Sequence, residues 1–81
     1  MKAAAEISMY PLDKDYIPAI EAFIERLKRH EGLSVRVNAM STQVFGPYDE
    51  VMEALRREIR ETFAQPHKVA VVIKLLNIDI G

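Results

Sequence analysis

Four hydrogen-bonding side chains gather in one short stretch of this chain, and a carboxylate lies in the first predicted strand. The stretch is NAMSTQVFG, residues 38–46, with Asn38, Ser41, Thr42 and Gln43, and the carboxylate is Glu6. Amide and hydroxyl groups both donate and accept hydrogen bonds, whereas a carboxylate only accepts them. A set of this kind offers donors and acceptors side by side. The sequence therefore raises the hypothesis of a polar binding pocket.

Six predicted elements position these side chains. Alternating apolar and polar residues predict strands, and apolar residues spaced three and four apart predict helices. The predicted order is strand, helix, strand, strand, helix, strand, over residues 3–12, 13–32, 33–40, 41–46, 46–63 and 68–77. Gly32 supplies the left-handed residue after the first helix, and Pro47 opens the second. We expect the two middle strands to turn tightly around Met40–Ser41.

This order predicts an α+β fold, the ferredoxin-like βαββαβ sandwich, as a single domain over residues 1–81. Its four-stranded antiparallel sheet has the order 4-1-3-2, and both helices lie on one face. Side chains alternate between the two faces of a strand, and this alternation places Thr42 on the face that the helices cover. The open face is predicted to carry Glu6, Ser8, Tyr10, Arg36, Asn38, Met40, Gln43, Phe45, Ala70, Val72 and Lys74. A face with both apolar and polar residues suits a subunit interface that contains polar pockets.

Composition argues against several partners. The chain has 81 residues, no cysteine, and a net charge of -1 from 11 basic and 12 acidic residues. This charge offers no long-range attraction to nucleic acid or to an anionic membrane. The N-terminus lacks the apolar core of a signal peptide, and no stretch is long enough to span a membrane. We therefore expect a cytoplasmic protein without nucleic-acid, membrane or metal partners and without a cofactor.

Other functions of this topology lack their characteristic residues. RNA-binding modules place paired aromatic residues on the central strands, and here only Tyr10 and Phe45 qualify. Metal chaperones need a Cys-x-x-Cys loop, and acylphosphatases need a glycine-rich anion loop with an arginine after the first strand. No spacing suggests a Ser-His or Cys-His nucleophilic pair. We therefore expect that the protein is not an enzyme.

Two stretches resemble a known family. The segments AEISMYPL, residues 5–12, and MSTQVFGPYDEVM, residues 40–52, are similar to the YkoF-like thiamine-binding proteins, and the likeness runs over nearly the whole chain. The resemblance implies a ferredoxin-like domain that associates through its sheet, as a homodimer or homotetramer. It also implies binding of thiamine or of its hydroxymethylpyrimidine half, without catalysis.

An aminopyrimidine presents an amine donor beside ring-nitrogen acceptors, so its site needs acceptors, donors and a flat apolar surface. The candidate ligand-binding residues are Glu6, Tyr10, Asn38, Ser41, Thr42, Gln43 and Phe45. Glu6 would accept from the amine, and Asn38 and Gln43 would each donate and accept. Tyr10 or Phe45 would stack on the ring.

Each candidate has a structural alternative. Glu6 and Asn38 could pair with Arg36 across a dimer interface, because buried polar groups are normally paired. Ser41 and Thr42 could satisfy the backbone of a turn, and Tyr10 and Phe45 could pack in an interface. The alternative function is then an oligomeric interaction or scaffolding domain without a ligand. In either case, the strand over residues 68–77 could add to the sheet edge of a second copy.

Overall fold

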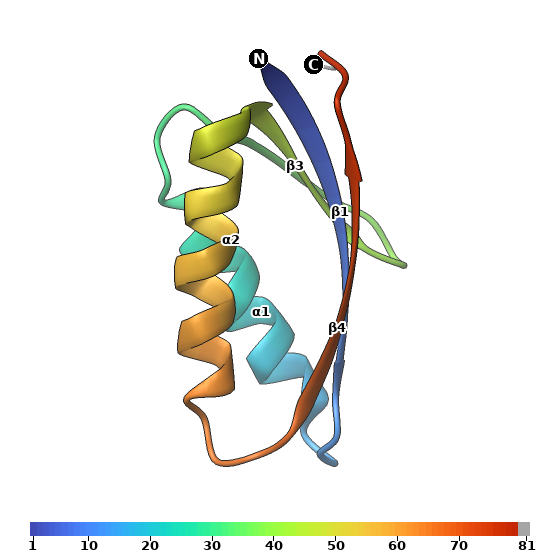
Figure 1. Cartoon of the computed structure of the whole chain (residues 1–81). Coiled ribbons are helices and arrows are strands. Elements are labelled where there is room, and N and C mark those ends of the chain that lie inside the picture. Colours follow the sequence, from blue (N-terminus) through green and yellow to red (C-terminus); the bar gives the residue numbers. More distant parts are fainter. Residues whose placement is uncertain (80–81) are drawn as a thin grey trace.

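The computed structural model describes residues 1–79. Its elements are β1 (Lys2–Pro11), α1 (Tyr16–Lys28), β2 (Ser34–Val37), β3 (Thr42–Pro47), α2 (Tyr48–Phe63) and β4 (Val69–Leu76). The strands form one antiparallel sheet in the order β2-β3-β1-β4, and both helices cover the same face (Figure 1). The ferredoxin-like α+β fold and the strand order expected from the sequence are therefore confirmed.

The core lies between the sheet and the two helices. Its buried residues are Ala5, Ile7, Phe23, Leu27, Val44, Val51, Ala54 and Leu55. The sheet residues of this set occupy alternate positions, as strand geometry requires, and the helical residues recur at spacings of three and four. This pattern confirms the predicted parity of β1 and β3, so Glu6 lies on the open face and Thr42 on the helix side.

The boundaries of the hairpin differ from the prediction. The strand predicted over residues 33–40 is observed only at Ser34–Val37, and the next begins at Thr42 rather than Ser41. Asn38, Met40 and Ser41 therefore lie in the turn, which is closed by a hydrogen bond from the Asn38 N–H to the Ser41 carbonyl at 3.0 Å. The cause is Asn38, whose side-chain oxygen accepts hydrogen bonds from the backbone N–H groups of Met40 and Ser41, both at 2.8 Å. Asparagine favours turns for this reason.

α1 is shorter than the span 13–32 predicted for it, since it covers Tyr16–Lys28 and its C-cap is Arg29, whereas α2 agrees closely with the span 46–63. Pro18 lies in the first turn of α1, and Gly32 adopts a positive φ of 84° in the turn after it. Pro47 directly precedes α2, whose first turn contains Asp49 and Glu50. These carboxylates stabilise the helix because they lie at the positive end of its dipole.

A polar network ties the two helices together. The Arg26 Nε donates to Glu58 at 2.9 Å, and its Nη2 donates to the Glu58 carbonyl at 3.1 Å and to the Thr62 hydroxyl at 2.7 Å. The ring of His30 contacts the other carboxylate oxygen of Glu58. The Glu58 side chain is only 13% exposed. This network fixes the helices relative to each other, and the sequence pattern did not predict it.

Candidate functional site

The polar cluster forms around the carboxylate of Glu6. Ser41 Oγ donates to Glu6 at 3.0 Å and Gln43 Nε2 donates at 3.4 Å, while Lys74 Nζ lies 3.8 Å from the second carboxylate oxygen. Glu6 and Gln43 are directly opposite each other in the β1–β3 register, and Lys74 is opposite Glu6 on β4. The sheet therefore brings side chains from β1, β3 and β4 together on its open face, next to Ser41 of the turn.

The charge state of Glu6 follows from these contacts. The hydrogen bond from Ser41 and then that from Gln43 lower the pKa of Glu6 below its ordinary value of 4.5; burial opposes them, and Lys74 adds a smaller lowering effect. Glu6 is therefore an anion at neutral pH. Its side chain remains 37% exposed, so the carboxylate can still accept a hydrogen bond from a ligand.

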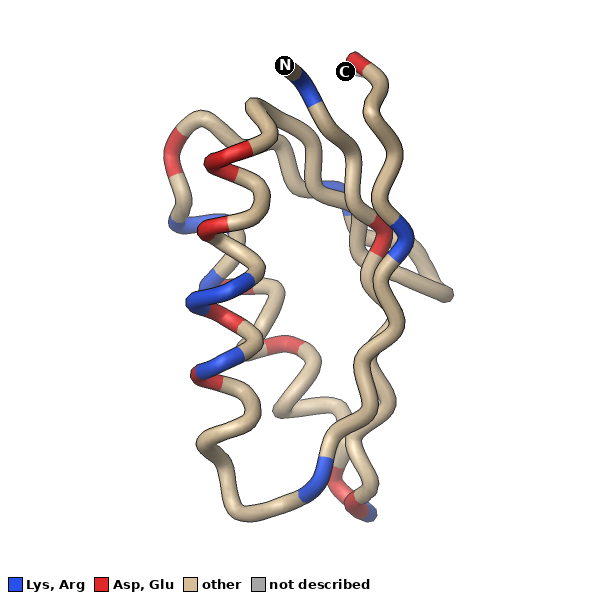
Figure 2. The backbone as a smooth tube through the Cα atoms, in the orientation of Figure 1, with Lys and Arg blue, Asp and Glu red and all other residues tan. Residues whose placement is uncertain are grey.

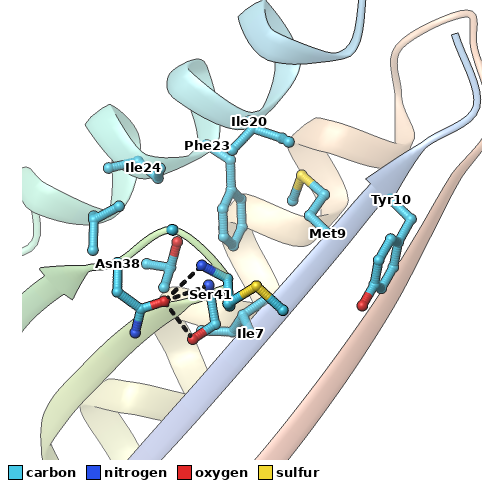
Figure 3. Close-up of a pocket in the computed structure, with 12 residues that line it drawn as sticks. Ile7, Met9, Tyr10, Ile20, Phe23, Ile24, Asn38 and Ser41 are labelled. Carbon is cyan, nitrogen blue, oxygen red and sulfur yellow. Dashed lines mark hydrogen bonds between the residues drawn. The ribbon is translucent and has the colours of Figure 1, made fainter.

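A pocket of about 290 Å³ lies next to this cluster, between α1 and the hairpin turn. Its lining includes Ile7, Met9, Ile20, Phe23 and Ile24 from the core side, and Tyr10, Val37, Asn38, Ala39, Met40, Ser41 and Thr42 from the rim and the hairpin. In Figure 3, the apolar side chains of α1 and β1 converge on the polar groups of Asn38 and Ser41. Ser41 joins the two features, because it lines the pocket and also donates to Glu6.

The pocket coincides with a gap in the sheet. β1 pairs with β3 only as far as Ile7, opposite Thr42, but it pairs with β4 as far as Pro11. The hairpin therefore ends early, and residues Ser8–Pro11 leave one edge of β1 without a strand partner within residues 1–79.

The register shows which backbone groups face this gap. The Tyr48 N–H donates to the Met1 carbonyl at 2.9 Å. Hydrogen-bonded pairs alternate along an antiparallel ladder, so Ala3, Ala5 and Ile7 continue the bonded series toward β3. The next member is Met9, which lies beyond the end of β3. The N–H and C=O of Met9 thus point together into the gap, beside the pocket that its side chain lines. This donor–acceptor pair could not be predicted from the sequence, because the gap depends on where the hairpin ends.

The turn holds its polar groups in a defined arrangement. Asn38 uses its side-chain oxygen to bind the turn backbone, so its amide nitrogen has no hydrogen-bond partner among the described residues. Likewise, the side-chain oxygen of Gln43 has none within residues 1–79, since its nitrogen binds Glu6. The site therefore offers a free donor and a free acceptor on either side of the Ser41 hydroxyl.

The structure separates the other candidates from this cluster. Thr42 is buried and only 6% exposed on the helix side, where it lines the pocket wall. Phe45 is also buried, and the guanidinium of Arg36 lies 5.3 Å from the centre of its ring. One face of that ring is therefore covered. Tyr10 is 55% exposed and lies at the far end of the pocket lining from Asn38 (Figure 3).

Residues 1–79 contain no group of three or more His, Asp or Glu side chains arranged to hold a metal ion. No helix in this part of the chain is long and apolar enough to cross a membrane.

Solved structures with the same fold come from several organisms. A hypothetical protein from Methanocaldococcus jannascii is 28% identical over 96% of this chain and 81% of its own, with a TM-score of 0.80. A protein from Streptococcus pneumoniae is 24% identical over 99% and 90%, with a TM-score of 0.88. A Thermotoga maritima protein, proposed to act in thiamine biosynthesis or salvage, is 23% identical over 90% and 82%, with a TM-score of 0.71.

The sequence comparison with curated proteins found no significant match. The comparison with protein families found one: residues 5–78 match the family described as thiamine-binding protein. That range contains all six secondary-structure elements in whole or in large part, and it includes both segments that resembled the YkoF-like proteins. The chain therefore belongs to the thiamine-binding protein family.

Proposed function

We propose that the protein binds thiamine or its hydroxymethylpyrimidine half in the gap between β1, α1 and the hairpin turn, and that it has no catalytic activity. The observation that carries the proposal is the junction at Ser41. There an apolar pocket meets an ionised carboxylate and several free hydrogen-bonding groups. Small-molecule sites combine these two features: apolar walls for affinity and a few placed polar groups for orientation.

The groups at this junction complement an aminopyrimidine. The exocyclic amine would donate to the Gln43 side-chain oxygen or to Glu6, and a ring nitrogen would accept from the Asn38 amide. The N–H and C=O of Met9 offer a second donor–acceptor pair to the other edge of the ring. The ring itself would lie against Met9, in the apolar part of the pocket. The cationic thiazolium would be attracted to the Glu6 carboxylate, which remains partly exposed.

A second candidate function is an oligomeric interaction domain without a ligand. Exposed apolar residues on or beside the open face favour it: Met40 is 85% exposed, Tyr10 55% and Val72 53%. Packing of two sheets face to face would cover these residues in a homodimer or homotetramer. The two functions are compatible, because the gap beside β1 opens at the margin of the same face.

A thermal-shift experiment tests the ligand. At a hundredfold excess over its dissociation constant, a ligand that binds only the folded state adds about 2.7 kcal/mol of stability. Each kcal/mol raises the Tm of a domain this size by roughly 4–8 °C. We expect such a shift with thiamine, and most of it with hydroxymethylpyrimidine alone.

The Glu6→Gln variant should lose most of this shift, because it removes the negative charge but keeps the shape of the side chain. Glu61→Gln is the matched control, since Glu61 is exposed on α2 and remote from the pocket lining. Its shift should equal that of the wild type. If neither compound shifts the Tm of the wild type, the ligand proposal is wrong, and the second candidate function, an oligomeric interaction domain, is the one supported.

A further inference from the structure

A second groove lies between α1 and the segment that connects the end of α2 to β4. Its volume is about 450 Å³, and it shares no residue with the pocket beside β1. The loops before α1 and before β4 meet at this end of the molecule, where the Leu12 N–H donates to the Lys68 carbonyl at 2.8 Å. Figure 2 shows both acidic and basic residues in this region, at the bottom of the view. The proposed binding of an aminopyrimidine makes no use of this groove.

The α1 wall of the groove carries opposite charges at its two ends. This wall includes Asp15, Ala19, Ala22 and Arg26. These residues follow one another at spacings of three and four, so they share one face of the helix. At about 1.5 Å per residue, the Cα atoms of Asp15 and Arg26 are about 16 Å apart. The two alanines between them are small and uncharged, so an elongated molecule with opposite charges at its ends could lie close to the helix.

Arg26 has donors to spare. A guanidinium group carries five N–H groups. Three of them are used, because Nε donates to the Glu58 carboxylate and Nη2 donates to the Glu58 carbonyl and to the Thr62 hydroxyl. The two N–H groups of Nη1 have no partner in the part of the chain that the structure describes. The Arg26 side chain is 23% exposed, so a carboxylate in the groove can reach it.

The carboxylate of Asp15 is also available. Asp15 is the N-cap residue of α1, but its side chain forms no cap hydrogen bond, and the residue is exposed. Its backbone N–H is engaged instead, with the side chain of Asp13 at 3.4 Å. An ammonium group at this end of the groove would therefore meet a charged acceptor.

The opposite wall holds two acceptors without donors. The Nε2 atom of His67 is buried and has no hydrogen-bond partner within residues 1–79. Its Nδ1 lies 3.8 Å from Asp13, and a proton on Nδ1 leaves Nε2 as an acceptor. Gln65 donates through its side-chain nitrogen to the Glu61 carbonyl at 3.5 Å, so its side-chain oxygen is free among the same residues. Buried polar atoms are normally paired, and an N–H donor of a bound molecule would complete the pairing of His67.

We propose that this groove binds a short, extended peptide with free ends. The carboxylate of the peptide would pair with Arg26 and its ammonium group with Asp15. Its amide N–H groups would donate to His67 and Gln65. An extended chain advances about 3.4 Å per residue, so a tripeptide is about 10 Å long. The 16 Å between the two Cα atoms is then about the right span, because helical side chains lean toward the N-terminus of their helix and Arg26 thus leans into the groove.

An NMR titration of the isotope-labelled protein with trialanine tests the proposal. The expected result is saturable shifts of the Ala19 and Ala22 backbone amides and of the His67 ring, with no shift of the Met9 amide. For a ligand of about 16 non-hydrogen atoms, a dissociation constant on the order of 0.1–1 mM is expected. Trialanine amide lacks the carboxylate and N-acetyl-trialanine lacks the ammonium group. Each should bind more weakly, by about fivefold for one partly exposed ion pair.

Two variants separate the groove from other contacts. Ala22→Leu introduces a larger side chain at an exposed helix position, where leucine is a good helix former, and it should abolish the shifts. Asp15→Asn should weaken binding about as much as acetylation of the peptide does. Glu21→Gln is the matched control, since Glu21 is exposed on the same helix and lies outside the groove lining, and it should bind like the wild type.

Three results would overturn the proposal. One is the absence of any saturable shift with trialanine at millimolar concentrations. Another is equal binding of trialanine and both blocked peptides, because the charged ends would then not be recognised. The third is a Ala22→Leu variant that binds trialanine as tightly as the wild type does.

Discussion

Replacing Glu58 with glutamine is expected to destabilise the protein by about 2 kcal/mol. In the wild type the carboxylate accepts from Arg26 Nε at 2.9 Å and contacts His30, and it is mostly buried. Hydrogen bonds to charged groups contribute about 1.5–3 kcal/mol. The loss should be partial, because Arg26 keeps its bonds to the Glu58 carbonyl and to Thr62. The corresponding fall in Tm is roughly 8–16 °C.

The effect should depend on pH with a definite sign. Burial alone raises the pKa of Glu58, but the hydrogen bonds with His30 and Arg26 outweigh it, so the pKa lies below the ordinary value of 4.5. A carboxyl group with a lowered pKa in the folded state stabilises the fold above 4.5 and loses that contribution as the pH falls through the folded-state pKa. The difference between wild type and Glu58→Gln should therefore be full at pH 7 and shrink below pH 4.5.

Thermal unfolding followed by circular dichroism at pH 7 and at pH 3 measures this difference. Glu61→Gln is the control on the same helix, and as an exposed substitution it should change stability by less than about 0.5 kcal/mol. If Glu58→Gln melts like this control at pH 7, the network does not hold the helices together. If its deficit persists unchanged at pH 3, the assigned charge state of Glu58 is wrong.

Two other substitutions test the core and the turn. Leu27→Ala should cost about 3 kcal/mol in urea unfolding, because Leu27 is fully buried between the sheet and the helices and the truncation leaves a cavity; a loss below about 1 kcal/mol would contradict this packing. Asn38→Ala should cost about 1 kcal/mol by removing the acceptor of two turn N–H groups, and Asn38→Asp, which keeps an acceptor oxygen, should retain most of the stability. Equal losses in both Asn38 variants would show that the side-chain oxygen does not hold the turn.

Local patterns predicted the fold well. The alternation of Ala5, Ile7 and Met9 gave the parity of β1, and with it the placement of Glu6 on the open face. Proline marked the start of α2, since Pro47 directly precedes it, and glycine marked the turn between α1 and β2, since Gly32 has a positive φ. These signals depend on the residue itself or on its neighbours in sequence, and for this reason they can be recognised without a structure.

The site was predicted only in part, because its geometry depends on contacts between distant segments. The sequence pointed to Glu6, Ser41 and Gln43, and the sheet does bring these three together. It treated Asn38 as a strand residue, whereas the side chain of Asn38 forms the turn. Because the turn begins at Asn38, β3 ends opposite Ile7, and this opens the gap beside β1 that the backbone of Met9 faces. No pattern within one segment reveals such a gap.

The exposure of β4 is a second feature that periodicity could not show. A nearly continuous apolar strand reads as buried on both faces, yet Ile73 and Leu75 are 39% and 51% exposed. The reason is that the helices pack mainly on the other three strands. The network of Arg26 and Glu58 was missed for a similar reason, since these two residues lie on different helices.

The central claim is that an aminopyrimidine binds in the gap beside β1, and an NMR titration of the isotope-labelled protein with hydroxymethylpyrimidine tests it most directly. The account predicts saturable shifts of the Met9 backbone amide and of the Asn38 side-chain amide. Signals from β4, such as that of Val72, should remain in place. No saturable shift, or shifts confined to α2 and β4, would contradict the account.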